Sequence, residues 1–267
     1  MIRIGTSGWV YPRWRGTFYP KALVQRRELE YMAQRLNSVE INGSFYALQR
    51  PESYQKWAAE TPEDFVFAVK APRFITHMKR LVDVDAPLAN FFASGVLALE
   101  GRLGPVLWQL PPNLRFDERV LAEFLAKLPM STAAAAELAT QHDDKVAGRA
   151  YTTTDEDRPL RHAIEVRHPS FDDPAVPRLL RDSGVALVIA DSAGRYPYFE
   201  DITADFVYIR LHGAEELYVS GYTSEALDEW AAKIRAWGKD TCVYFDNDVK
   251  VRAPFDAMAL RERLQNS

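Results

Sequence analysis

Eight short apolar runs alternate with longer amphipathic stretches along this chain of 267 residues, and this alternation constrains the fold more than any other feature. The runs have the length and composition of strands: IRIG, SVEIN, DFVFAVK, GPVLWQL, HAIEVR, VALVIAD, FVYIRLHG and TCVYFDN. Apolar residues recur every three or four positions in most of the intervening stretches, which predicts helices. Eight strand–helix units in one chain of this length predict a single-domain (β/α)8 TIM-type barrel, with an open doubly wound sheet as the alternative.

Cap residues and breaks refine this prediction. Residues typical of helix ends stand where starts and stops are expected: Pro51, Asp117, Thr223, Gly184 and Gly238. One helical stretch is predicted over residues 86–99. The unit between the sixth and seventh strands is incomplete, because residues 191–204 are too short and too rich in proline and aromatic residues for a full helix. The Ala-rich residues 131–149 predict an additional surface helix and loop.

Three of the predicted strands carry charged or polar side chains on one face and apolar ones on the other. Side chains alternate along a strand, so the polar face holds Glu40 and Asn42, Glu165 and Arg167, and Arg210 and His212. The apolar face suits packing under helices, and the polar face is therefore predicted to point into the barrel near its carboxyl end. Other strand ends add Lys70, Gln109, Asp191 and Asn247. Active sites of barrel enzymes are built at this end.

These groups suggest acid/base chemistry on an anion. Two carboxylates in different environments can differ in pKa, so Glu40 and Glu165 are the predicted acid/base pair, with His212 assisting proton transfer. Lys70, Arg167 and Arg210 are predicted to hold a phosphate or carboxylate. The structural alternative is an ion-pair network that only ties the barrel interior together.

The predicted loops at the same end are rich in aromatic and basic residues. Further predicted binding residues are Trp9, Tyr46, Arg73 and His77. Residues 1–27 contain six Lys or Arg and no acid, although the whole chain has a net charge of −4. Aromatic rings beside basic groups suit sugars and nucleobases. We therefore expect a hydrolase, lyase or isomerase type of enzyme for a small anionic, phosphorylated or sugar-containing molecule, with nucleic-acid binding or metal-dependent phosphodiester cleavage as the alternative.

Several other classes of protein fit poorly. No apolar run approaches the roughly 20 residues that span a bilayer, and the strand-like start predicts a cytoplasmic protein without an export signal. Cys242 is the single cysteine and is expected to be an inert core thiol. Carboxylates and His212 offer ligands for a divalent metal, but interleaved Lys and Arg disfavour one, and the cofactor stays unknown. The Walker, dinucleotide and Gly-x-Ser-x-Gly patterns do not occur.

Seven motifs, in order and over nearly the whole chain, resemble the YecE-like family, domain of unknown function 72. They are GTSGWVYPRWRGTFYP (5–20), VEINGSFY (39–46), FAVKAPRFITH (67–77), LWQLPP (107–112), EVRHPSF (165–171), YIRLHG (208–213) and YFDND (244–248). The resemblance implies a TIM-type barrel in a bacterial cytoplasmic protein and implies no particular activity. The motif YFDND departs from the pattern at Asp246, where Asn is expected, so no role is assigned to that carboxylate.

Overall fold

The strands of the computed structural model, which describes residues 1–265, are all parallel and lie in two hydrogen-bonded sheets. One sheet has the order β2-β3-β4-β5-β6 and the other β1-β9-β8-β7. The strands are β1 (Ile2–Thr6), β2 (Ser38–Ile41), β3 (Val66–Lys70), β4 (Leu103–Gln109), β5 (His162–Glu165), β6 (Ala186–Leu187), β7 (Ile189–Asp191), β8 (Phe206–Leu211) and β9 (Asp240–Phe245).

Two short junctions join these sheets into a barrel. Only Val188 separates β6 from β7, and its amide donates to the Ile164 carbonyl at 2.9 Å, so both segments belong to one barrel strand. On the other side, a parallel bridge pairs Ser7 with Glu40 where β1 meets β2. The nine segments therefore make eight barrel strands in chain order, which confirms the predicted TIM-type barrel over the open sheet.

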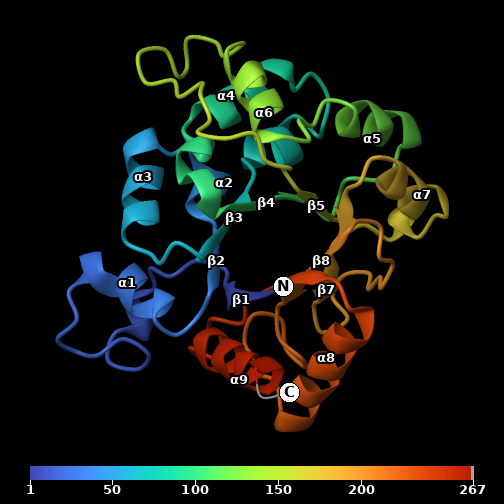
Figure 1. Ribbon diagram of the computed structural model, residues 1–267. Coiled ribbons are helices and arrows are strands. Elements are labelled where there is room, and N and C mark those ends of the chain that lie inside the picture. The colour runs from blue at the N-terminus through green and yellow to red at the C-terminus, as the bar shows by residue number, and fades with distance from the viewer. Residues whose placement is uncertain (266–267) are drawn as a thin grey trace.

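Helices surround the strands on the outside (Figure 1). They are α1 (Glu28–Ala33), α2 (Gly43–Tyr46), α3 (Pro51–Ala59), α4 (Asp85–Ala93), α5 (Glu118–Leu125), α6 (Thr132–Ala139), α7 (Ala175–Asp182), α8 (Ser224–Trp237) and α9 (Ala253–Gln265). Short helical turns are η1 (Pro12–Trp14), η2 (Gln25–Arg27), η3 (Phe74–Met78), η4 (Val96–Arg102) and η5 (Pro169–Phe171). In the described part of the chain, no helix is long and apolar enough to cross a bilayer.

Most predicted helix ends are found where the cap residues stand. Asp117 and Thr223 each accept a hydrogen bond from the backbone amide three residues ahead, and Gly238 ends α8 at a φ of 60°. The single helix predicted over 86–99 is wrong. It breaks at Gly95, whose φ is 112° and whose missing Cβ leaves room for Pro51, the first residue of α3.

The two irregular segments follow the sequence prediction. Residues 192–205, between β7 and β8, contain no helix in the structure, as the density of proline and aromatic residues indicated. The Ala-rich stretch forms α6, an additional helix that contacts α4 outside the barrel. Its Ala135 and Ala139 are fully buried, so small side chains let the two helices approach closely.

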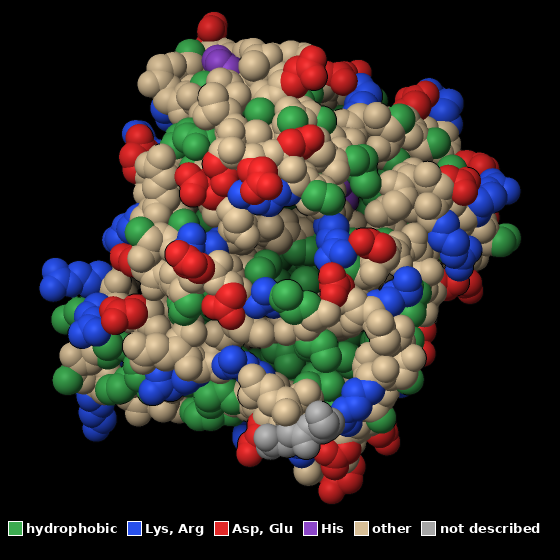
Figure 2. All heavy atoms as spheres, in the orientation of Figure 1, with side chains coloured by type: hydrophobic (Ala, Val, Ile, Leu, Met, Phe, Trp, Pro, Cys, Tyr) green, Lys and Arg blue, Asp and Glu red, His purple; other side chains and the backbone are tan. Residues whose placement is uncertain are grey.

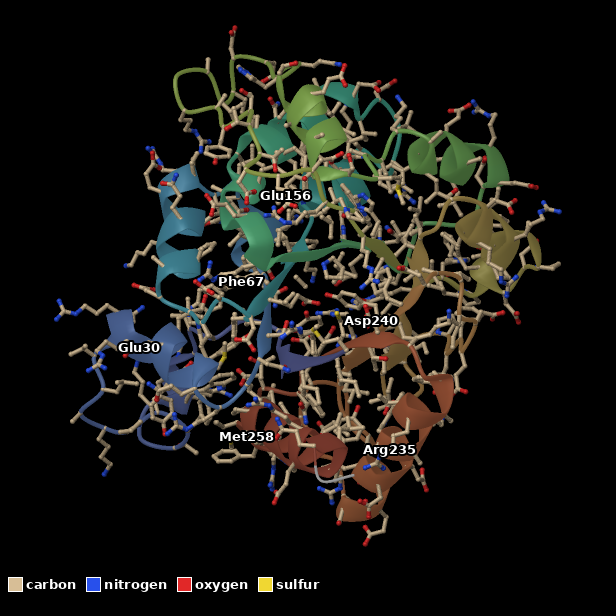
Figure 3. The ribbon with its side chains drawn as sticks, in the orientation of Figure 1. Glu30, Phe67, Glu156, Arg235, Asp240 and Met258 are labelled. Carbon is tan, nitrogen blue, oxygen red and sulfur yellow. The ribbon has the colours of Figure 1, made fainter. Side chains whose placement is uncertain are left out.

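The barrel interior changes from apolar to charged along its axis. Inward residues toward the amino end form a small core that includes Ala68, Leu107, Phe206 and Cys242, and Cys242 is buried there as expected. A larger core packs the outer strand faces against the helices, and Figure 3 marks Phe67 of β3 between strands and helices. The view in Figure 2 shows basic and acidic side chains interspersed around a central hollow with hydrophobic atoms. Neither sign of charge therefore dominates this face.

Candidate active site

A cavity of about 720 Å³ opens at the carboxyl ends of the strands. Its walls come from residues that follow seven different barrel strands, because parallel strands bring all their carboxyl ends to one rim. The lining side chains include Trp9, Tyr11, Asn42, Phe45, Tyr46, Gln49, Trp57, Lys70, His77, Gln109, Arg167, Tyr218 and Asp246. The cavity is therefore aromatic on its walls and polar or charged toward the barrel interior.

Arg210 holds two strand carboxylates together below this cavity. Its Nε and Nη2 donate to Glu40 at 3.0 and 2.8 Å, and its Nη1 donates to Glu165 at 2.7 Å. All three side chains are fully buried. Glu40 also accepts from the hydroxyls of Ser7 and Tyr208, at 3.0 and 2.8 Å. Buried charges need such pairing, and the predicted ion-pair network between strands is present.

The second carboxylate of this network, Glu165, links Arg210 to the cavity. Its Oε1 accepts from Nε of Arg167 at 2.7 Å, and the Arg167 guanidinium lies 4.5 Å from the centre of the Tyr196 ring. Burial raises the pKa of Glu165, but Arg167 and Arg210 outweigh burial and hold it well below its ordinary value. Glu165 is therefore ionised, and Arg167 has one face toward the cavity.

Asp246, at the end of β9, brings a carboxylate to the cavity itself. Its Oδ2 lies 3.1 Å from both Arg210 Nη2 and His212 Nδ1, and its side chain is 20% exposed. Burial opposes ionisation, yet Arg210 and His212 keep the pKa of Asp246 below its ordinary value. His212 is fully buried, and its Nε2 lies 3.6 Å from Glu165 Oε1. The imidazole thus stands between two carboxylates.

Lys70 lies above this network and forms no ion pair with any residue of the described range 1–265. It ends β3, is 9% exposed, and its Nζ lies 4.3 Å from the centre of the Phe45 ring. Burial, together with the positive charge of Arg210, lowers its pKa to about 8. A fraction of Lys70 is therefore a neutral amine near neutral pH, and this amine faces the cavity.

His77 and Tyr11 are two further titratable groups of the cavity. The His77 ring packs edge-on to Phe45 with centres 5.1 Å apart. Burial and the neighbouring Lys70 and Arg167 lower its pKa to about 4, so it is neutral at physiological pH. The Tyr11 hydroxyl donates to the Ser7 carbonyl, and burial raises the pKa of this phenol.

The structure separates the predicted site residues into three groups. Those that line the cavity are Trp9, Asn42, Tyr46, Lys70, His77, Gln109 and Arg167. Those that form the buried network below it are Glu40, Glu165, Arg210 and His212. Arg73 lines a neighbouring groove. Asp191 accepts a hydrogen bond from the Tyr222 hydroxyl, and Asn247 donates to the Ser220 carbonyl and to Asp256. Asp191 and Asn247 thus fix the loop after β8 and do not reach the cavity lining.

Several lining residues were not among the predicted site residues, including Tyr11, Phe45, Gln49, Trp57, Tyr218 and Asp246. Asp246 follows directly from strand alternation, since it lies two positions after the inward Tyr244, and this signal could have identified it. Tyr218 reaches the cavity from a long loop, with its ring 5.4 Å from His212, and Trp57 reaches it from α3. Placement of these two depends on tertiary packing, which strand alternation does not encode.

The residues of this centre do not form an evident metal site. Among residues 1–265, no group of three or more His, Cys, Asp or Glu side chains is arranged to hold a metal ion. Arg210 occupies the space between the three carboxylates Glu40, Glu165 and Asp246. Their oxygen atoms are directed at the Arg210 guanidinium, which supplies the positive charge that a metal ion would otherwise supply.

Comparisons with known proteins agree with this architecture. The family model described as Protein of unknown function DUF72 matches residues 3–267. The chain belongs to the DUF72 family. A crystal structure of a DUF72 family protein (TM1631) from Thermotoga maritima is similar over 99% of each chain, with a TM-score of 0.79 and 28% identity. The resemblance inferred from the motifs is thereby confirmed.

Other similar proteins match at lower identity or over a shorter length. The UPF0759 protein YecE of Escherichia coli K12 is 26% identical over 91% of this chain and 85% of its own. The UPF0759 protein YunF of Bacillus subtilis is 33% identical over 42% of this chain and 40% of its own. A D-psicose 3-epimerase from Clostridium cellulolyticum, solved with D-tagatose, has a TM-score of 0.50 at 10% identity over 99% of this chain, a likeness of fold alone.

Proposed function

We propose that the cavity is the active site of an enzyme that binds a small anionic, sugar-like molecule and transfers a proton on it. The observation that carries this proposal is the convergence of Lys70, Arg167 and Asp246, from three different strands, on one cavity. Ligand pockets of this volume, about 300–1,000 Å³, accommodate a small organic molecule. Barrel enzymes assemble their reacting groups at this same rim.

Recognition of an anion is assigned to Arg167 and Lys70, the two cations that line the cavity. The Nε of Arg167 donates to Glu165, but the side chain also lines the cavity. Its remaining N–H groups are therefore available to a carboxylate or phosphate. The Trp9 and Trp57 rings pack edge-on at 5.3 Å on the wall, and aromatic faces of this kind suit the C–H surface of a sugar. Asn42 and Gln109 supply amides for its hydroxyl groups.

Proton transfer is assigned to the titratable groups that reach the cavity. Asp246 is an ionised carboxylate and Lys70 an amine of lowered pKa, so the cavity holds a base and a group that both gains and loses protons near neutral pH. Glu40 and Glu165 lie beneath them and accept from Arg210. Their predicted acid/base role stays a prediction, and the contacts favour Glu40, Glu165 and His212 as positioning residues.

Deuterium exchange tests the proposal without knowledge of the net reaction. The protein is incubated in D₂O with sugar phosphates, sugar acids and their neutral parent sugars, and deuterium at carbon is followed by NMR. We expect exchange in an anionic compound, a loss of at least tenfold in Asp246→Asn, and no loss in the control Lys56→Met, whose lysine is exposed on α3. Absence of exchange from every compound, or unchanged exchange in Asp246→Asn, would contradict the proposal.

A neighbouring groove supports nucleic-acid binding as a second candidate function. This groove of about 760 Å³ shares Phe45 and Tyr46 with the cavity and carries Arg73, Lys145 and Arg149. Tyr46 is 73% exposed and available for stacking on a base. Fluorescence anisotropy with a labelled single-stranded oligonucleotide tests it: affinity should fall steeply with salt and fall again in Arg73→Ala. Absent or salt-insensitive binding would remove this candidate.

A further inference from the structure

Lys70 combines burial with the lack of a charged partner. Arg210 and Arg167 each pair with carboxylates, whereas Lys70 makes no ion pair or hydrogen bond through Nζ with any residue in the described range 1–265. Its contact is the face of Phe45. An ammonium in this position is poorly solvated and has no carboxylate of the described residues within ion-pair distance. This burial outweighs the more distant Glu40, Glu165 and Asp246, so the position favours the neutral amine.

We propose that Lys70 is a nucleophile that forms a Schiff base with the carbonyl carbon of an anionic aldehyde or ketone bound in the cavity. This inference rests on the proposed function and names the substrate class of the same site. A desolvated lysine beside another cation is the environment in which an amine becomes a nucleophile.

The bond changes balance without any further reagent. The neutral Lys70 amine adds through nitrogen to the carbonyl carbon, and one of its two protons passes to the carbonyl oxygen to give a carbinolamine. The second nitrogen proton then leaves with the hydroxyl as one water molecule, and a C=N bond remains. Protonated, this bond withdraws electrons from the adjacent carbon, which then loses a proton to a base such as Asp246.

A second unpartnered group lies beside Lys70. Asn42 is the first residue after β2, and Lys70 is the last residue of β3. Because Ile41 pairs with Val69, Asn42 and Lys70 lie next to each other at the rim. The Asn42 Oδ1 atom is buried and has no hydrogen-bond partner in the structure of residues 1–265. An unpaired buried acceptor is costly, and a hydroxyl donor on the carbonyl compound would satisfy it. Arg167, on the same cavity, would hold the anionic end.

Reductive trapping tests the inference directly. The protein is incubated with pyruvate, dihydroxyacetone phosphate, ribose 5-phosphate or neutral dihydroxyacetone, and sodium cyanoborohydride is added to reduce any imine. Mass spectrometry then gives adducts per chain and their positions. For a phosphorylated or carboxylated probe we expect one adduct, on Lys70, at least tenfold above any other lysine. The phosphate and carboxylate probes show which anion is recognised.

Variants separate specific chemistry from surface modification. The adduct should vanish in Lys70→Arg and Lys70→Met and remain in Lys56→Met. Arg167→Met should reduce trapping of the anionic probes at least tenfold and leave the neutral one unchanged. Adducts spread evenly over the lysines, or retained in Lys70→Arg, would overturn the inference. Deuterium exchange at carbon without a Lys70 adduct would overturn the Schiff base alone, whereas failure of both experiments would overturn the proposed function as well.

Discussion

At the scale of single residues, the network under the cavity depends on one guanidinium. Arg210 donates to Glu40, Glu165 and Asp246 while fully buried. A guanidinium suits this position because its N–H groups spread in a plane toward several carboxylates at once. Lysine carries the same charge but would leave some of these oxygens without a donor.

Removal of Arg210 should therefore be severely destabilising. Arg210→Met leaves Glu40 and Glu165 buried without their principal partner, and we expect a loss of about 3–5 kcal/mol in the free energy of unfolding at pH 7. Urea denaturation measures it. Arg119→Met is the control, because Arg119 pairs with Glu123 on the surface of α5 and such pairs contribute less than about 1 kcal/mol. Equal effects of the two substitutions would contradict a central role for Arg210.

Removal of Lys70 should have the opposite effect and raise the free energy of unfolding. Its pKa falls from an ordinary 10.5 to about 8 on folding, so below pH 8 the folded protein bears the whole cost of a buried ammonium. One pKa unit corresponds to about 1.4 kcal/mol, and Lys70→Met should thus stabilise the protein by about 3 kcal/mol at pH 7.

The stability difference between Lys70→Met and the wild type should depend on pH, and this dependence serves as the control. The advantage of Lys70→Met should shrink as pH rises from 8 to 10.5, because the amine then becomes neutral in both the folded and the unfolded chain. Urea denaturation at pH 7 and pH 10 measures the difference. A destabilising Lys70→Met, or an advantage that does not change with pH, would show that Lys70 is not a desolvated cation.

At the scale of elements, the join between β1 and β2 depends on a glycine. A Cβ atom on Gly5 would lie 2.1 Å from the Ser38 carbonyl oxygen, so the two strands meet only if this position lacks a side chain. The same join contains the Ser7–Glu40 bridge that carries Glu40 into the network. Close backbone contact therefore positions a charged residue of the site.

Substitution of that glycine should open the join. Gly5→Ala should destabilise the protein by about 1–3 kcal/mol or more, as expected for overpacking against backbone. Gly101→Ala is the matched control, because its nearest atom to an added Cβ is Arg158 Nη2 at 4.0 Å. Thermal unfolding compares the two variants. A harmless Gly5→Ala would mean that β1 and β2 are not in close contact.

Sequence patterns predicted the strands and helices better than the breaks within them. Strand alternation placed Glu40, Glu165 and Arg210 inside the barrel, because a period of two is a local property. The break between α4 and η4 at Gly95 escaped prediction, since it reflects close packing on Pro51, which is distant in the sequence. Asn247 is a different case: it follows the inward Asp246, so strand alternation itself turns it away from the cavity, to Asp256 of α9.

At the scale of the whole molecule, charge is distributed along the barrel axis. The amino half of the interior is apolar, and the carboxyl half holds three carboxylates against Arg210, Arg167 and Lys70. The net charge of −4 does not reveal this arrangement, because local fields depend on which charges share a cavity. These six charges balance, so the proposed anion would be bound by direct contact with Arg167 and Lys70, the two cations that line the cavity, and not by a net positive charge.

The most direct test of this account is thermal unfolding of the wild type and Arg167→Met with sugar phosphates, sugar acids and their neutral parents. An anionic ligand at about 100 times its Kd should stabilise the wild type by about 2.7 kcal/mol, which is about 5–10 °C in Tm for a chain of this size. The shift should disappear in Arg167→Met and persist in Arg178→Met, whose arginine pairs with Glu118 on the surface. Equal shifts in both variants, or none with any compound, would contradict an anion-binding active site at the barrel rim.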